Sequence, residues 1–251
     1  MKFLKQIGFI FIVAIILAFN QAKDKTTIFL IGDSTMSQKS MKAYPETGWG
    51  MPFTHFFDST VVVENHAQNG RSTRTFIEEN RWQPILTKLK KGDYVFIQFG
   101  HNDEVPTKKS YTTEKDFKSN LLRFVKESRS KKAIPVLITP VARRKFNSEG
   151  KIVDTHEIYA ALVKEVAQQN KVPVIDLSSS SMKLLQDFGV EKSAYLFNHL
   201  APGQNPNYPN CKIDDTHFNE LGARYMAQLV LAEIKSLNLA LSSKIIKPVK
   251  K

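Results

Sequence analysis

The stretch Phe29-Leu-Ile-Gly-Asp-Ser-Thr-Met36 joins an apolar run directly to a polar Gly-Asp-Ser-Thr turn. Similar short runs, rich in β-branched and aromatic residues, recur along the chain at residues 27–31, 61–64, 94–99, 134–139 and 172–177. Apolar runs of this length, without polar alternation, are typical of strands buried on both faces of a parallel sheet. The sequence therefore predicts five such strands.

Helical patterns lie between and after these runs. Apolar residues recur at helical spacing in three segments: Phe117, Leu121, Phe124 and Val125; Ile158, Leu162 and Val166; and Leu221, Tyr225, Leu229 and Val230. Strands that alternate with helices imply right-handed crossovers between parallel strands. We therefore expect an α/β fold, a three-layer α/β/α sandwich built on a five-stranded parallel sheet.

The two ends of the chain predict its boundaries. Lys2 and Lys5 precede an uncharged apolar run from residue 7 to residue 19, a layout typical of a secretory signal peptide, here expected over 1–22. The apolar run is short for a membrane span, which needs about 20 such residues. One domain over 23–240 and a solvated basic tail over 241–251 are expected to follow. The protein is thus predicted to be exported, to the periplasm or the medium.

Composition limits how such a domain is stabilised and which classes of partner it binds. Cys211 is the single cysteine, so no internal disulfide is possible and the core must supply the stability. The chain carries a formal charge of +12 at pH 7. A basic surface either serves solubility or favours an acidic polymer such as a uronic-acid polysaccharide. Basic residues are not interleaved with aromatic ones in the pattern of a β-ribbon or a recognition helix, so we expect no nucleic-acid partner.

Polar clusters follow the predicted strands where their carboxyl ends should meet. Gly-Asp-Ser-Thr follows the first strand, His66-Ala-Gln-Asn-Gly-Arg71 the second and Gly100-His-Asn-Asp103 the third. A further cluster, Asp214-Asp-Thr-His217, precedes the last helical pattern. In open parallel sheets, reactive groups collect beyond the carboxyl ends of the strands. These four clusters are therefore expected to form one site.

The residue types in the four clusters suit acyl transfer, which needs a nucleophile, a base, a group that orients the base and oxyanion donors. Ser34 is the candidate nucleophile and His217 its base. Asp214 is the expected orienting carboxylate, with Asp215 ranked second because its return to the histidine is tighter. Since the base must be neutral, activity is expected to fall on acidification as His217 takes up a proton.

Three N–H groups are candidates for the oxyanion hole. They are the backbone N–H of Ser34, the backbone N–H of Gly70 and the side-chain amide of Asn102. Ser34 alone could equally be a helix cap, and Asn69-Gly70 alone is more often a simple turn. The interpretation rests on all the clusters occurring together.

These residues resemble a known family. Gly32-Asp33-Ser34, Gly70, Gly100-x-Asn102-Asp103 and Asp214-x-x-His217 are similar to the four ordered sequence blocks of the SGNH (GDSL-type) hydrolases, across residues 27–237. The resemblance implies a flavodoxin-like sandwich and a serine esterase mechanism without a cofactor. It also implies that Ser34, Asp214 and His217 form the catalytic triad and that Ser34, Gly70 and Asn102 form the oxyanion hole.

Within that family the chain is most similar to the rhamnogalacturonan acetylesterases, in family twelve of the carbohydrate esterases. Thr35, Gly48-Trp49-Gly50, Asn69-Gly-Arg-Ser72 and Asp214-Asp-Thr-His-Phe218 carry this finer resemblance. It implies the removal of acetyl groups from a pectic backbone that contains galacturonate. The substrate would then be an acetylated acidic polysaccharide, which fits the basic charge.

Other conspicuous residues have weaker signals. The six histidines lack the spacing of a metal motif, so no metal is expected. Trp49, between two glycines, is a candidate sugar-stacking residue, whereas Trp82 in a helical pattern is expected in the core. Arg71 is a candidate carboxylate-binding residue, with a solvated helix start as its default role. His101 is expected to form a structural hydrogen bond.

Two alternatives stay open at this stage. One is the same chemistry on acetylated xylan or another acylated carbohydrate. The other is a noncatalytic polysaccharide-binding protein on an esterase scaffold, which the complete set of blocks disfavours. We further expect a monomer without stable membrane insertion after signal cleavage.

Overall fold

A computed structural model describes residues 25–247, which fold around one five-stranded sheet. Its strands are β1 (Thr26–Gly32), β2 (Val61–Asn65), β3 (Tyr94–Gln98), β4 (Ile134–Ile138) and β5 (Val174–Ile175). The strand order is β2-β1-β3-β4-β5, and every neighbouring pair is parallel. The predicted five-stranded parallel sheet is therefore confirmed.

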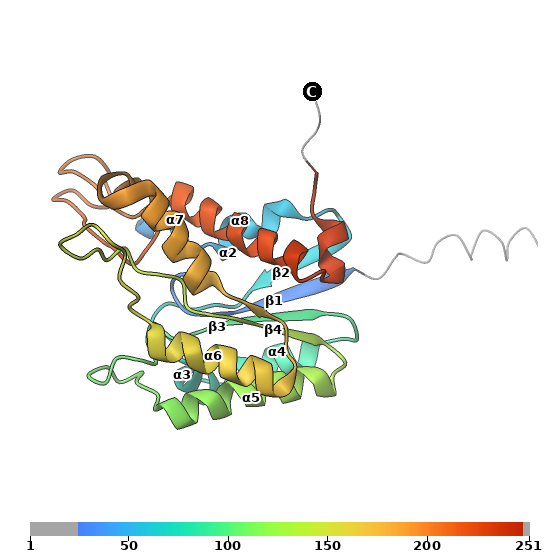
Figure 1. The fold of residues 1–251 in the computed structure, drawn as a ribbon. Coiled ribbons are helices and arrows are strands. Elements are labelled where there is room, and N and C mark those ends of the chain that lie inside the picture. The colour runs from blue at the N-terminus through green and yellow to red at the C-terminus, as the bar shows by residue number, and fades with distance from the viewer. Residues whose placement is uncertain (1–24, 248–251) are drawn as a thin grey trace, which may run out of the picture.

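Helices cover both faces of the sheet and complete the three predicted layers (Figure 1). One layer contains α2 (Gly50–Phe53), α7 (Leu177–Lys192) and α8 (Glu220–Ser236). The other contains α3 (Thr73–Glu78), α4 (Trp82–Lys88), α5 (Glu114–Ser130) and α6 (Glu157–Asn170). Short 3-10 turns occupy Met41–Ala43, Thr54–Phe56, Ser193–Leu196 and Ala240–Lys244.

Alternation along β1 divides the core in two. Ile28 and Leu30 pack into the cluster under α2, α7 and α8, whereas Phe29 and Ile31 pack into the cluster under α3 to α6. All four are at most 2% exposed. Burial of such a side chain stabilises the fold by about 1.5–3 kcal/mol. The strand is thus fixed from both sides, and with it the turn that follows.

Three details differ from the sequence expectations. Ile158, placed on the buried face of α6, is 57% exposed, and Tyr159 and Val163 are buried instead. Leu221 at the start of α8 is 49% exposed. The strand expected over 172–177 is paired only at residues 174 and 175, because Asp176 ends it by capping α7 through a bond from the Ser179 N–H at 3.3 Å.

The boundary expected at residue 240 is wrong for the described part of the tail. Leu241 and Ile245 are 2% and 9% exposed and belong to the core cluster under α8. Ile245 forms an antiparallel bridge with Phe57, and the Lys244 ammonium donates to the Thr60 hydroxyl at 2.8 Å. Two apolar residues among the lysines therefore extend the packed domain to Ile245.

The predicted signal peptide over 1–22 lies outside the described residues. Between residues 25 and 247, no helix has both the length and the apolar character needed to cross a membrane.

Candidate active site

The nucleophile candidate lies where β1 ends and the chain turns sharply. Asp33 accepts hydrogen bonds on Oδ1 from the Thr35 N–H (2.9 Å) and the Thr35 hydroxyl (2.8 Å), which closes a tight turn around residue 34. Asp33 is fully buried, and burial raises its pKa above the ordinary value although the two Thr35 bonds oppose this. Ser34 is 9% exposed, so the turn presents its hydroxyl at the floor of a depression.

Ser34, His217 and Asp214 form a continuous chain of hydrogen bonds. The distance from Ser34 Oγ to His217 Nε2 is 2.9 Å, and that from His217 Nδ1 to Asp214 Oδ2 is also 2.9 Å. Because an ionised carboxylate only accepts, the proton of the neutral imidazole is assigned to Nδ1. Nε2 is then free to accept the serine proton, which is the tautomer that a general base requires.

Asp214 is held as a carboxylate. Burial alone would raise its pKa, but the bond and charge of His217 and the backbone N–H groups of His217 and Thr216 hold that pKa well below its usual range. Both N–H groups donate to Oδ1 at 2.9 Å. The backbone bonds leave Oδ2 pointing at the imidazole.

The second candidate for orienting the histidine lies elsewhere. Asp215 accepts from Arg144 at 2.9 Å and contacts His199 Nε2 at 2.8 Å. Asn219 caps α8 by accepting from the Gly222 N–H at 3.0 Å. Of the two carboxylates, the geometry thus selects Asp214.

The three residues that carry the expected oxyanion donors, Ser34, Gly70 and Asn102, border one pocket of about 330 Å³ together with Asp214 and His217. Gly70 has a φ of +75°, a conformation that disfavours residues with a side chain. Within residues 25–247, no protein group accepts from the N–H groups of Ser34 and Gly70. Both are free to donate to a ligand in the pocket.

Asn102 is positioned by contacts at both ends of its amide. Nδ2 donates to the Arg71 carbonyl at 3.1 Å, which leaves its second hydrogen for a ligand. Oδ1 lies 3.4 Å from the Lys108 ammonium. With Ser34 and Gly70, the amide can meet an oxygen that becomes negative during acyl transfer.

The expectation that Trp49 stacks on sugar is wrong. Trp49 is 0% exposed, and its Nε1–H donates to Gln98 Oε1 at 2.7 Å. Gln98 Nε2 donates in turn to the Thr35 hydroxyl at 2.6 Å, and that hydroxyl donates to Asp33. Trp49 therefore supports the turn at Ser34 through this chain of hydrogen bonds, and it has no exposed surface on which a sugar could stack. Trp82, expected in the core, is 2% exposed.

The turn that carries Gly70 is braced by residues that the sequence did not single out. Asn69 Oδ1 accepts from the Ser37 hydroxyl at 2.5 Å and from the Lys39 ammonium at 2.8 Å. Lys39 also pairs with Glu46 at 2.7 Å, and its side chain is 1% exposed. Burial lowers the pKa of Lys39, whereas Glu46 opposes that shift. A buried lysine in a loop, seven residues after the end of β1, has no periodic signal that would reveal it from the sequence.

Arg71 lies at the edge of the site with its guanidinium already engaged. Its Nε donates to both carboxylate oxygens of Glu79, at 2.9 and 3.1 Å, and its Nη1 donates to the Asn69 carbonyl at 2.8 Å. These contacts brace the turn at Gly70. A role of Arg71 in binding a substrate carboxylate stays a prediction.

His101, next to the oxyanion amide, points away from the pocket. It contacts the Val141 carbonyl through Nε2 at 3.0 Å, as expected of a structural residue. Its ring lies 4.2 Å from that of His156, and burial together with the charge of His156 holds its pKa well below the ordinary value. In the part of the chain that the structure describes, no group of three or more His, Cys, Asp or Glu residues is arranged to hold a metal ion.

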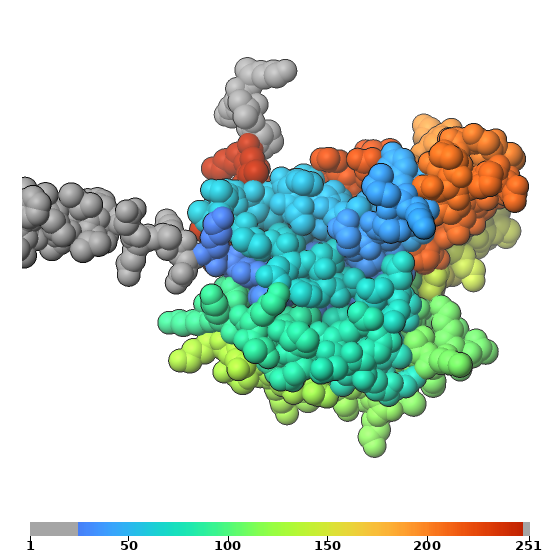
Figure 2. Space-filling model, turned by 180° about the vertical axis from the view of Figure 1, so that it is seen from behind, coloured from blue at the N-terminus to red at the C-terminus, as the bar shows by residue number. Residues whose placement is uncertain are grey.

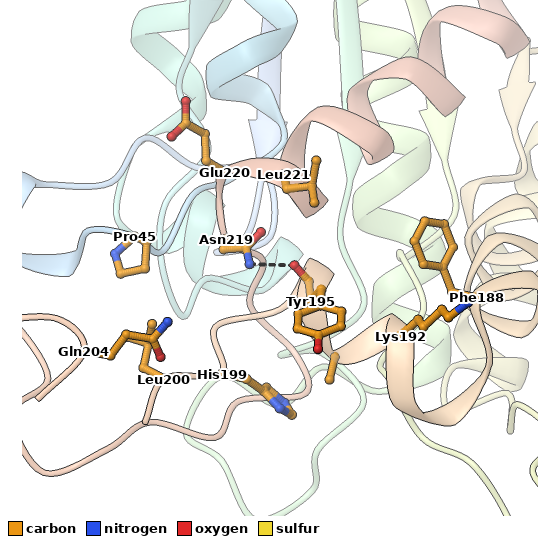
Figure 3. Close-up of a pocket in the computed structure, with 11 residues that line it drawn as sticks. Pro45, Phe188, Lys192, Tyr195, His199, Leu200, Gln204, Asn219, Glu220 and Leu221 are labelled. Atoms are coloured by element: carbon orange, nitrogen blue, oxygen red, sulfur yellow. Dashed lines mark hydrogen bonds between the residues drawn. The ribbon is translucent and has the colours of Figure 1, made fainter. Parts of the chain in front are cut away.

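A larger pocket, of about 820 Å³, is lined in part by Leu200, which forms an antiparallel bridge with Lys212 (Figure 3). Tyr195, Leu221 and Phe188 border it, and Asn219 Nδ2 donates to the Tyr195 carbonyl at 2.8 Å. None of the triad or oxyanion candidates lines this space. Volume alone therefore does not locate the chemistry in this molecule.

Two loops that are far apart in the sequence lie against each other. The segment around residues 41–45 (blue) lies against the segment around 200–210 (orange) in Figure 2. Asn207 donates to the carbonyls of Met41 and Tyr44 at 2.9 and 2.8 Å, and the Tyr208 hydroxyl donates to the Ala43 carbonyl at 3.0 Å. These bonds hold the two loops against each other.

Comparisons with known proteins agree on a family. The model of the GDSL-like Lipase/Acylhydrolase family matches residues 30–225. Rhamnogalacturonan acetylesterase RhgT of Bacillus subtilis is 41% identical over 225 residues, which are 89% of this chain and 96% of that protein. The probable rhamnogalacturonan acetylesterase YesY of the same organism is 36% identical over 88% of this chain and 97% of that protein.

Solved structures share the fold. The crystal structure of protein YXIM of Bacillus subtilis has a TM-score of 0.75 at 29% identity, and the match covers 86% of this chain and 58% of that one. Axe2, an acetylxylan esterase of Geobacillus stearothermophilus, has a TM-score of 0.58 at 19% identity over 84% of this chain and 96% of that one. At that identity the second likeness shows the fold alone.

Proposed function

The chain belongs to the GDSL-like lipase/acylhydrolase family and is an esterase, and we propose that it removes acetyl groups from rhamnogalacturonan through an acetyl-serine intermediate. The observation that carries the mechanism is the chain of bonds from Ser34 through His217 to Asp214, facing three free N–H donors in one pocket. The substrate rests on the similarity to RhgT and YesY over nearly the whole chain.

The first half of the reaction acylates Ser34. Its Oγ attacks the acetyl carbonyl carbon while His217 Nε2 takes the hydroxyl proton. The carbonyl oxygen becomes an oxyanion, to which the N–H groups of Ser34 and Gly70 and the Asn102 amide donate. When the tetrahedral intermediate collapses, the C–O bond to the sugar breaks and His217 returns its proton to the sugar oxygen.

The second half releases acetate. A water molecule gives a proton to His217 Nε2 and attacks the acetyl-serine carbonyl, the same donors bind the oxyanion, and Ser34 Oγ leaves with the proton from His217. Asp214 stays ionised throughout and stabilises the imidazolium formed in each half. No residue beyond those of the pocket is required, and no cofactor takes part in these steps.

Export of the protein is part of the proposal, and the signal peptide predicted over 1–22 supports it. The basic charge suits a galacturonate-containing polymer.

The test is acetate release from acetylated rhamnogalacturonan by the wild-type protein and by Ser34→Ala, beside acetylated xylan and an aryl acetate. Release that is strongest on the pectic polymer and lost in the variant is expected. Release from xylan or the aryl ester alone would support the esterase activity but reject rhamnogalacturonan as the substrate. Equal rates for the two proteins would reject Ser34 as the nucleophile.

A further inference from the structure

The pocket at Ser34 continues into a second depression. That neighbouring depression, of about 450 Å³, shares Gly70, Asn102 and Lys108 with it and extends to Arg71, Glu79 and Lys109. We call it the basic groove. Because the shared residues include two of the three oxyanion donors, a sugar next to an acetylated residue at Ser34 would lie in this groove.

The basic groove carries more positive than negative charge. Arg71 and Glu79 pair with each other at 2.9 Å, and Glu79 also pairs with Arg81 at 2.5 Å. Lys108 and Lys109 are both exposed, and among residues 25–247 neither ammonium is paired with an acid. The groove thus presents two adjacent positive charges that no protein carboxylate neutralises.

The loop that carries these lysines is held in place. The Lys108 N–H donates to the Val105 carbonyl at 3.0 Å, and the Tyr111 N–H donates to the Lys108 carbonyl at 3.0 Å. Arg74 donates from Nη2 to the Lys109 carbonyl. At the end of the loop, the Ser110 hydroxyl donates to the Asn102 carbonyl at 3.2 Å. These bonds hold the backbone at both lysines relative to Asn102, while the lysine side chains are exposed.

We propose that Lys108 and Lys109 form a binding site for a uronic acid carboxylate of the polysaccharide, close to the acetyl ester that Ser34 attacks. This inference rests on the proposed function and names the residues that distinguish an acidic backbone from a neutral one such as xylan. An ammonium binds a carboxylate through charge-assisted hydrogen bonds, which are stronger than neutral ones. A neutral sugar in the groove would make no such bonds.

The other lysines near the pocket, Lys212 and Lys39, are already paired with protein carboxylates, so they do not compete for a substrate carboxylate. Lys212, across the pocket, lies 3.3 Å from Asp214, and Lys39 is buried against Glu46. The bound carboxylate therefore lies on the side of Gly70 and Asn102, and not on the side of Asp214.

The test is a binding measurement that needs no ester. An unacetylated rhamnogalacturonan oligosaccharide is titrated calorimetrically into the wild type and into Lys108→Gln/Lys109→Gln. The matched control is Lys90→Gln/Lys91→Gln, an exposed adjacent pair just before β3, at the opposite end of the strands from the site. Both variants lose two positive charges, so net charge is equal.

We expect the groove variant to bind about tenfold more weakly, because it loses two exposed ion pairs, and the control to change less than about twofold. Lys108→Arg/Lys109→Arg should retain most of the affinity. The carboxyl-reduced oligosaccharide should bind the wild type as weakly as the native one binds the groove variant. Added salt should weaken wild-type binding more than that of the groove variant.

Equal losses in the groove and control variants would overturn the inference, since net charge alone would then explain binding. Equal affinities for the native and carboxyl-reduced oligosaccharides would also overturn it. The outcome is separate from that of the proposed function. Lysine-dependent binding without acetate release from rhamnogalacturonan would reject the proposed reaction and leave the carboxylate site standing.

Discussion

Replacement of Trp49 by phenylalanine separates a supporting role from a sugar-binding role. The change keeps an aromatic ring in the core but removes the indole N–H that donates to Gln98 at 2.7 Å. Gln98 is 0% exposed, so its Oε1 would be left buried without a donor.

The expected cost follows from that lost donor. A buried acceptor left without a partner destabilises a protein by about 1–3 kcal/mol. For a domain of this size, 1 kcal/mol shifts the melting temperature by about 2–4 °C, so Trp49→Phe should melt about 2–12 °C below the wild type. Because Gln98 also holds Thr35, kcat should fall while KM for the polysaccharide changes little.

The assay combines urea denaturation with initial rates on acetylated rhamnogalacturonan and on an aryl acetate. Gln98→Met, which removes the acceptor, is the matched variant, and the double variant should cost less than the sum of the two single changes. Unchanged stability together with a several-fold higher KM for the polymer alone would refute this reasoning, because Trp49 would then contact substrate.

Three further predictions concern neighbouring residues. Asp214→Asn should lower kcat about ten-thousandfold by favouring the wrong tautomer of His217, whereas Asp215→Asn should lower kcat far less. Similar losses of kcat in the two variants, measured in stopped assays, would reject Asp214 as the residue that orients His217. Asn102→Ala should lower kcat on a short acetate ester about 100- to 1000-fold with little change in KM, and an unchanged kcat would remove this amide from the oxyanion hole. Burial raises the pKa of Asp103 from 3.8 to about 7, so between these pH values the folded protein binds a proton that the unfolded chain has lost, and stability falls as the pH rises. Asp103→Asn, which keeps an acceptor oxygen, should remove this pH dependence. Its free energy of unfolding should therefore rise relative to that of the wild type by up to about 4 kcal/mol between pH 4 and pH 8. If urea denaturation gave parallel pH profiles for the two proteins, the raised pKa of Asp103 would be contradicted.

The sequence predicts most of this fold because its strands are buried on both faces. Ile28 and Phe29 lie on opposite faces of β1, yet both are apolar, so the whole run is visible without knowing which residue faces which layer. Helix faces were less certain, since Ile158 is exposed although it fits the spacing of Leu162 and Val166. Packing against α5 places Tyr159 inward instead, which spacing alone does not determine.

The residues of the candidate site were recognisable because each follows an element end that the fold brings to one edge of the sheet. Trp49 was misjudged because flanking glycines usually indicate an exposed loop. Here a side chain on Gly48 would come within 2.1 Å of the Ser37 carbonyl, so the glycine permits close packing. Lys39 was missed because a surface lysine and a buried one look alike in a single sequence.

The bond between Ser34 and His217 joins residues 183 positions apart. The nucleophile therefore emerges from the ribosome long before its base, and the site is assembled only after the segment ahead of α8 has been made and docked. Contacts of such long sequence separation form slowly. Hydrolysis of an ester by this protein thus reports on a finished chain, and no fragment ending before residue 217 carries the complete set of reacting groups.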